Sequence, residues 1–264
     1  MAARSSVEPE GAPYLPFEDG RFRLAMGLMP LAPVDWLEID GNLARDLAAK
    51  RALFDTRHGE VFGALPGAEA PASELLALLA DHLVQHHPAL FRRAGDLLHS
   101  AATGESWDVA HPPLHPLDLC GRLVQEDFCL LAAEDGGSFR LIGATLCSPS
   151  RWRLADKIGR PLAAIHAPVP GYAETLERPV DRFFAALKPG RLVWRLNWTI
   201  VDDPTPFQPA RIPGTAAITA ANAGAHLWLR VERQTLRTPR RRRAAARRAS
   251  SAYSCHCSHA ASRE

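Results

Sequence analysis

Two long segments with strict alternation of apolar and polar residues constrain the fold of this chain most strongly. In RLVWRLNWTIV, which begins at Arg191, every second residue from Leu192 to Ile200 is apolar, and HLWLRVERQTL, from His226, alternates in the same manner. Successive side chains of a strand point to opposite faces, so this period predicts two strands that share an apolar face. The opposite face carries Arg195, Asn197, Arg230 and Glu232. Such a face must meet water, counter-charges or a polar ligand group, and the pattern leaves these alternatives open.

A hairpin is predicted earlier in the chain. The segments LVQEDFCLLAA and FRLIGATLC flank the turn Glu134-Asp135-Gly136-Gly137. The two glycines can adopt positive φ without steric cost, which favours a tight turn between two strands. Together with the helical patterns described next, these strands predict an α+β fold.

Three helices are predicted before the hairpin. Helical spacing of apolar residues over 43–54 indicates the first, and Ser73 is a plausible cap for a second over 75–83. Pro88 can begin a third helix that continues through Leu98, and the proline-rich segment HPPLHPLD at 111–118 is expected to be a connection.

The segment PSRWRLADKIGRPLAAIHAPVP, residues 149–170, contains the most suggestive histidine. Ser150 can cap a helix that Gly159 ends, since Pro161 prevents its continuation. His166 then lies between an apolar approach and two prolines, which leaves its side chain little freedom. That rigidity suits a ligand to a metal or haem, and it also suits a core histidine with satisfied hydrogen bonds. The pattern alone does not exclude either, and the arginines and lysine of this segment fit a solvated helix face equally well.

Composition indicates one compact, cytoplasmic body. With 264 residues, of which 47% are hydrophobic, the chain can bury a large core. The start MAARSSVEPEGAP lacks the apolar centre of a secretory signal, and no apolar run approaches the roughly 20 residues of a membrane helix. Cys120, Cys129 and Cys147 lie singly among apolar residues and are expected to be reduced core side chains.

The end of the chain differs in charge from the rest. Residues 237–264 carry eight arginines and one glutamate, a net charge of +7, whereas residues 1–236 carry −5. This segment has neither an apolar stripe nor interleaved aromatics, so we expect no specific nucleic-acid binding and no packed structure. The expected organisation is an extension over 1–23, a folded domain over 24–237 and a basic disordered tail over 238–264.

Several blocks resemble a known family. LCSPSRWRLADKIGRPLAAIHAPVPGY, VDRFFAAL, RLNW and LRVERQTLR follow one another in the order and spacing of the haem-dependent oxidative N-demethylase family, described also as the α subunit of dimethylamine monooxygenase. The resemblance covers roughly residues 24 to 237. It implies a PAS-like antiparallel sheet with flanking helices, a b-type haem, and oxidation of an N-methyl group of a small amine by dioxygen, with release of formaldehyde. The tail departs from the family pattern, and a shift of reading frame near Arg237 would account for it.

The resemblance gives provisional roles to individual residues. His166 is the expected axial ligand of the iron, with His111 and His115 as weaker candidates. Tyr172 is the expected hydrogen-bond donor to iron-bound oxygen or to the substrate, although a purely structural hydroxyl is an equal alternative. Propionate pairing and apolar contact with the macrocycle are expected from cationic residues and tryptophans, namely Arg151, Arg153, Lys157, Arg195, Arg230, Trp152, Trp194 and Trp198.

The enzyme interpretation also requires a partner. The chain shows neither ferredoxin cysteine spacing nor a dinucleotide fingerprint, so electrons from NADPH would have to arrive through a separate flavin/iron–sulfur protein. Two further hypotheses remain open at this point: a haem-binding or ligand-binding PAS-like module without turnover, and an inactive truncated relative.

Overall fold

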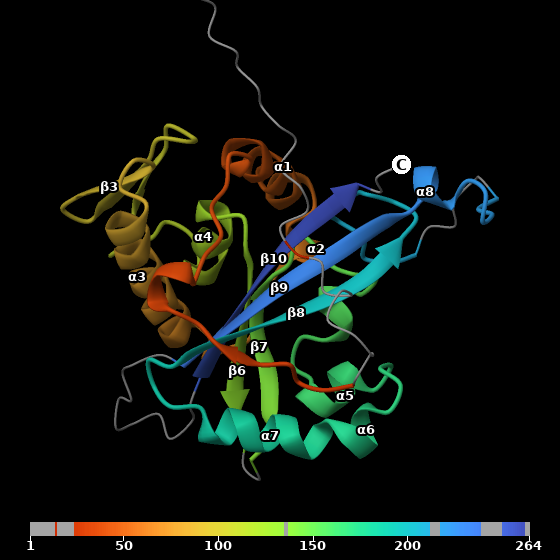
Figure 1. The fold of residues 1–264 in the computed structure, drawn as a ribbon. Helices are drawn as coiled ribbons and strands as arrows, with labels where there is room; N and C mark the ends of the chain where they lie inside the picture. The colour runs from red at the N-terminus through yellow and green to blue at the C-terminus, as the bar shows by residue number, and fades with distance from the viewer. Residues whose placement is uncertain (1–13, 15–23, 135–136, 212–216, 239–249, 262–264) are drawn as a thin grey trace, which may run out of the picture.

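The computed structural model describes residues 14, 24–134, 137–211 and 217–238, and the backbone of residues 250–261. Within these ranges the chain is α+β, as predicted, with a seven-stranded and a three-stranded antiparallel sheet (Figure 1). The elements in chain order are β1 (Met29–Pro30), η1 (Pro33–Asp35), α1 (Leu43–Thr56), α2 (His58–Val61), β2 (Phe62–Ala64), α3 (Glu69–His86), β3 (Phe91–Ala94), β4 (Leu97–Ser100), β5 (Ser106–Asp108), α4 (Pro116–Leu123), β6 (Asp127–Ala133), β7 (Phe139–Thr145), η2 (Leu154–Asp156), α5 (Leu162–His166), α6 (Tyr172–Thr175), α7 (Glu177–Ala186), β8 (Leu192–Val201), α8 (Ala223–His226), β9 (Trp228–Arg237) and β10 (Ser250–Ala261).

The large sheet has the strand order β1-β8-β9-β10-β6-β7-β2. Its longest pairing joins the two alternating segments: β8 and β9 are in register from Leu192↔Arg237 to Val201↔Trp228. The predicted hairpin is present as β6 and β7, and Gly137 adopts a φ of 88° in its turn. Strand period and turn chemistry therefore predicted these four strands correctly.

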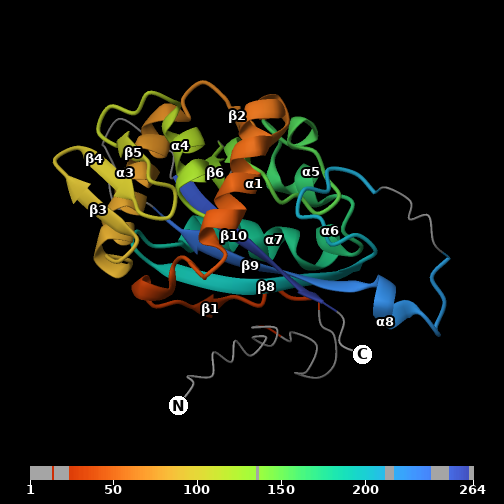
Figure 2. The same cartoon turned by 90° about the horizontal axis from the view of Figure 1, so that it is seen from above.

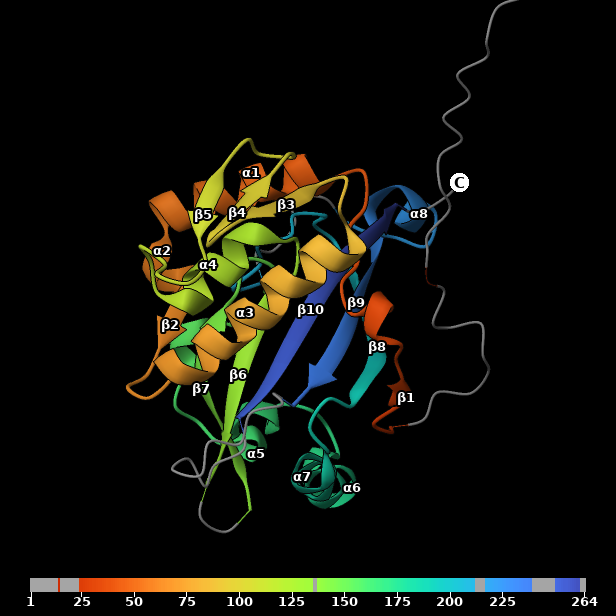
Figure 3. The ribbon, with the colours of Figure 1, turned by 90° about the vertical axis from the view of Figure 1, so that its left-hand side faces the viewer.

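The C-terminal segment corrects one prediction. Residues 250–261, expected to be unpacked, form strand β10 between β9 and β6, with backbone pairing on both sides (Figure 3). The prediction averaged composition over the whole tail, but residues 250–261 contain no Arg, Lys, Asp or Glu. Backbone hydrogen bonds along both edges satisfy the main chain of such a strand without a strongly apolar sequence. β10 thus joins the two halves of the sheet.

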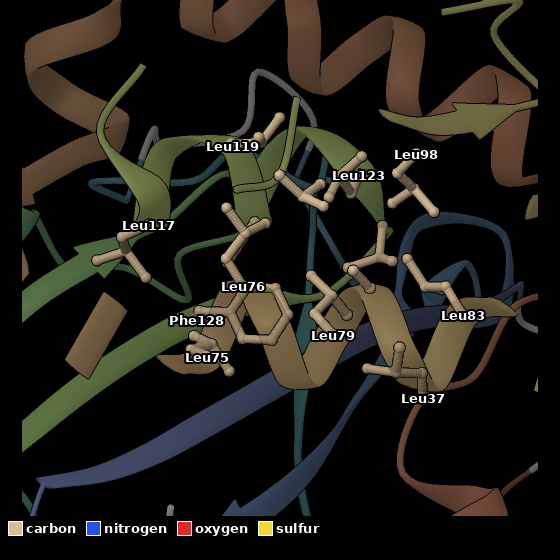
Figure 4. Packing of buried hydrophobic residues seen from close by; sticks show 14 of the residues in the cluster. Leu37, Leu75, Leu76, Leu79, Leu83, Leu98, Leu117, Leu119, Leu123 and Phe128 are labelled. Carbon is tan, nitrogen blue, oxygen red and sulfur yellow. The ribbon is translucent and has the colours of Figure 1, made fainter. Parts of the chain in front are cut away.

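Helices α1, α3 and α4 cover one face of this sheet. Their apolar side chains form the largest core cluster, which includes the buried leucines of α3 and α4 and reaches Phe128 of β6 (Figure 4). Gly121 lets α4 approach β7 closely, because a Cβ added there would lie 2.7 Å from Thr145 Cγ2. The absence of a side chain at this position is therefore a packing requirement.

Helices α5, α6 and α7 lie on the opposite face, with α6 and α7 near one end of the strands (Figures 1 and 2). Val193 of β8 and Leu236 of β9 pack here with Phe184 of α7. Since side chains alternate along a strand, Arg195, Asn197, Arg230 and Glu232 share this face, as their register partners confirm. The polar face of the sequence pattern is thus turned toward α5–α7.

Three helix predictions and one predicted connection differ from the structure. The segment after Pro88 forms β3, β4 and β5 instead of a helix, because Gly95 takes a φ of 59° and turns the chain between β3 and β4. Helix α3 begins at Glu69, and the Ser73 hydroxyl donates to the Glu69 carbonyl within the helix instead of capping it. The expected connection at 111–118 already contains the first turn of α4.

The third helix prediction that differs is the helix expected from Ser150. Only the short 3₁₀ segment η2 forms, because Ser150 bridges to Gln208 and Arg151 adopts a φ of 59°. A left-handed residue at that position is incompatible with a helix start. Segment η2 already ends at Asp156, and Gly159, with a φ of 80°, turns the chain three residues later.

The three cysteines expected in the core are confirmed as core residues with free thiols: Cys120 and Cys147 are buried, and Cys129 packs against the α5–α7 side. Burial raises the pKa of Cys129 and of Cys147 to about 12. Among the described residues, no helix is both long and apolar enough to cross a bilayer.

Candidate functional site

His166 is the last residue of α5. The helix begins after Pro161, whose backbone is extended (φ −67°, ψ 153°), and Ile165 N donates to Pro161 O at 3.0 Å. Leu162 is buried in the cluster between this helix and the sheet. One turn of helix therefore carries the histidine away from a buried anchor, toward the polar face of β8 and β9.

The imidazole of His166 is held by one hydrogen bond. Its Nδ1 lies 2.9 Å from Leu162 O. A carbonyl only accepts, so Nδ1 carries the proton and Nε2 keeps a lone pair. Among the described residues, no hydrogen bond engages Nε2. Burial lowers the pKa of His166, and the charges of Lys157 and Arg195 lower it further against the opposing effect of the Leu162 bond. The ring is therefore neutral at pH 7, with Nε2 available as a metal ligand.

Tyr172 lies against this imidazole. Gly171 takes a φ of 73°, which turns the chain back so that Tyr172 begins α6. The two rings are stacked, with centroids 4.8 Å apart and planes inclined by 13°. Burial raises the pKa of Tyr172 to about 12, and the charges of Asp181 and Glu177 add to this effect. The phenol thus keeps its proton at neutral pH.

Lys157 and Trp152 approach the same site from the segment around η2. The Lys157 ammonium lies 4.7 Å from the centre of the Trp152 ring and donates to Ile165 O at 3.2 Å. Burial lowers the pKa of Lys157, whereas Cys129, Asp156 and Glu232 raise it. A half-buried cation thus stands beside the end of α5.

The polar face of β8 and β9 completes the site. Glu232 Oε2 accepts from Asn197 Nδ2 at 3.4 Å and from Gln234 Nε2 at 3.3 Å. Arg195 Nε is buried, and in the described part of the chain it has no hydrogen-bond partner. A buried guanidinium nitrogen without a partner is costly, so this position favours a hydrogen-bond acceptor that the described residues do not supply.

The structure brings together five of the predicted site residues: His166, Tyr172, Lys157, Trp152 and Arg195. Three other predicted residues have protein partners. Arg151 pairs with Asp202 at 3.1 Å, and Arg153 forms two hydrogen bonds with Asp156 on the surface. Arg230 is fully buried and donates to Pro206 O and Ser148 O. These two hydrogen bonds connect β9 with the loops that contain Pro206 and Ser148.

The alternative histidines lie elsewhere. The His111 side chain is 83% exposed, with Nδ1 3.8 Å from Asp108 Oδ2. His115 Nδ1 accepts from Leu117 N at the start of α4, which covers the other face of the sheet. Trp194 also points away from His166, because its ring contacts Tyr14 and the Arg233 guanidinium on that opposite side. Alternation places Trp198 on the same side as Trp194.

Asp181 and Glu177 of α7 are the residues that the sequence analysis missed. They raise the pKa of the Tyr172 phenol, and burial with the charge of Glu177 raises the pKa of Asp181 as well. No motif or helical spacing connects Tyr172 with these two acids, because Tyr172 lies in α6 and the acids lie in α7, a separate helix. The sequence offered no signal for this contact.

The polar groups of this site match two requirements of a haem. A haem iron needs an imidazole with a free nitrogen fixed in orientation, and its propionates need cationic partners. His166 offers the first through Nε2, and Arg195 Nε, which has no partner among the described residues, offers the second. The described residues contain no group of three or more metal-ligating side chains, a condition that single-histidine ligation of a haem does not require.

Comparison with known proteins agrees with this geometry. A model of the family described as "haem-dependent oxidative N-demethylase, alpha subunit-like" matches residues 27–245. The match covers well over half of the chain and includes every residue of the site just described. This chain belongs to that family.

Proposed function

We propose that this chain is the haem-binding subunit of a monooxygenase that removes an N-methyl group from a small methylated amine, such as dimethylamine. The observation that carries the proposal is the neutral His166 imidazole, anchored at Nδ1 and open at Nε2, beside two cations. Membership of a haem-dependent demethylase family supports it. The proposal includes the PAS-like character of the sheet and a cytoplasmic location, where reduced nicotinamide cofactors are present.

In this proposal His166 would hold the iron of haem b through Nε2, and the Leu162 carbonyl fixes the ring by its bond to Nδ1. Arg195 would pair with a propionate and Trp152 would contribute apolar surface, while Lys157, which already donates to Ile165 O, would add positive charge beside them. Haem b, when bound, supplies the reduction of dioxygen that inserts one oxygen atom into a C–H bond of the N-methyl group, with two electrons and two protons converting the other atom to water. The carbinolamine product breaks its C–N bond to give formaldehyde and the demethylated amine.

Tyr172 holds a proton at its hydroxyl throughout the neutral range, because burial and the charges of Asp181 and Glu177 oppose ionisation. It can therefore donate a hydrogen bond to a ligand and cannot act as a general base there. The stacked ring also limits rotation of the His166 imidazole. The protonated hydroxyl and the stacked ring are both present in the described structure, so neither effect requires the chain to move.

The reaction needs an electron donor. The alpha-subunit-like family implies partner subunits. We propose a separate flavin/iron–sulfur protein that transfers electrons from NADPH, since this chain contains no such centre by its sequence motifs.

The test is turnover by the purified, haem-loaded protein with NADPH, a reductase and dimethylamine. The proposal predicts formaldehyde release that requires dioxygen and NADPH, and parallel loss of dimethylamine. A protein that retains haem but releases no formaldehyde from a panel of methylated amines would be a non-catalytic haem module. A folded protein that binds no haem would instead be an inactive relative, and either result contradicts the proposal.

A further inference from the structure

Lys157 connects the segment after η2 with the helix that carries His166. Its Nζ donates to Ile165 O at 3.2 Å, and Ile165 directly precedes His166. The carbonyl belongs to the last turn of α5, where helix carbonyls lack an intrahelical partner. One side-chain hydrogen bond therefore fixes the backbone immediately before the imidazole.

The rest of the Lys157 side chain is also fixed. The ammonium lies 4.7 Å from the centre of the Trp152 ring, at cation–π distance. Charged and polar neighbours that act on it come from three other elements: Cys129 of β6, Asp156 of η2 and Glu232 of β9. The cation is thus held in one place beside His166 and is not a freely moving surface lysine.

We propose that Lys157 is a positioning residue for His166, which fixes the end of α5 by its bond to Ile165 O and places a positive charge beside the imidazole. This inference rests on the proposed function above, in which His166 binds the haem iron. A positive charge near the ligand favours the electron-richer ferrous state, so Lys157 raises the reduction potential of the iron. Loss of the hydrogen bond leaves the end of α5 less well fixed.

Two substitutions separate the two effects. Lys157→Met keeps a long apolar side chain that can still contact Trp152, but it removes both the charge and the donor. Lys157→Arg keeps the charge and changes the geometry of the donor. Arg160→Met is the matched control, because Arg160 lies in the same segment with an exposed side chain.

The first measurement uses haem-free protein. Amide hydrogen exchange over residues 162–166 should be faster in Lys157→Met than in the parent and in Arg160→Met, while the global unfolding temperature changes little. Unchanged exchange in Lys157→Met would overturn the positioning role. Because this measurement does not need haem, it tests the positioning role of Lys157 even in a protein that binds no haem. Failure of this inference can therefore be distinguished from failure of the proposed function.

The second measurement uses haem-loaded protein. We expect haem to dissociate roughly tenfold faster from Lys157→Met, as for loss of one hydrogen bond from a charged group. The reduction potential should fall in Lys157→Met and return toward the parent value in Lys157→Arg. An unchanged potential in Lys157→Met, in a protein where His166→Ala does disrupt haem binding, would overturn this inference alone.

Discussion

The rings of His166 and Tyr172 lie parallel, with centroids 4.8 Å apart and 13° between their planes. The contact fixes the imidazole from its face, while the Leu162 carbonyl fixes it at its edge. A ring held at two places can present Nε2 in only one direction. The two aspects of Tyr172, its ring and its hydroxyl, are therefore separable by substitution.

Tyr172→Phe keeps the ring and removes the hydroxyl, whereas Tyr172→Leu removes the ring. We expect haem affinity of Tyr172→Phe close to that of the parent, and a loss of roughly tenfold in Tyr172→Leu, because an aromatic pair contributes about 0.5–1.5 kcal/mol beyond its buried area. Haem titration followed by absorbance measures both. Equal affinities for the Phe and Leu variants would show that stacking does not position His166.

Lys50 is a buried cation on the other face of the sheet. Its Nζ donates to the carbonyls of Val124, Gln125 and Glu126 and lies 3.4 Å from Asp127 Oδ1. Lys50→Met should lower the free energy of unfolding by about 3–5 kcal/mol, since it leaves a buried carboxylate without its cation. Urea denaturation measures the change. The double variant Lys50→Met/Asp127→Asn should recover part of the loss, and a single variant as stable as the parent would contradict this account.

Three histidines meet near the end of α3. The ring of His82 contacts those of His86 and His87, and packs against Trp36. Burial, followed by the charges of His86, His87 and Arg237, lowers the pKa of His82 to about 3. The unfolded chain therefore binds this proton more readily than the folded one.

The contribution of His82 to the free energy of unfolding should therefore be fully present above about pH 7. It should decrease as the pH drops below the ordinary histidine pKa of about 6.5. At pH 5, protonation of His82 in the unfolded chain should lower the free energy of unfolding by up to about 2 kcal/mol, at 1.36 kcal/mol per pH unit. Thermal unfolding between pH 8 and pH 5 measures it. His82→Gln should show a shallower pH dependence, and an equal slope in the two proteins would contradict the assignment.

The sequence predicted what depends on local pattern. Alternation identified β8 and β9, and turn chemistry identified the hairpin of β6 and β7, whereas the role of His166 stays a prediction. It did not reveal that Lys157 binds Ile165 O, because that contact spans the turn at Gly159 and depends on the arrangement of η2 against α5. The β3–β5 sheet was missed because Gly95 at positive φ overrides the helical spacing around it.

The position of β10 in the sheet gives a further prediction. Because β10 pairs with both β9 and β6, a chain that ends after Thr238 exposes two strand edges. We expect this truncation to lose several kcal/mol of stability, on the scale of a domain's whole margin, and to aggregate. Removal of residues 262–264 alone is the control. A truncated protein with the parent's unfolding temperature would show that β10 is dispensable.

The most direct test of the central claim is a haem titration of the parent protein, His166→Ala and His111→Ala, followed by absorbance and by the spin state of the iron. The account predicts one stoichiometric haem complex with the same spectrum for the parent and for His111→Ala, and loss of binding or an altered spin state for His166→Ala. Circular dichroism of the haem-free proteins shows whether each variant is folded. A folded His166→Ala protein that binds haem with the parent's affinity and spectrum would contradict the assignment of His166 as the ligand.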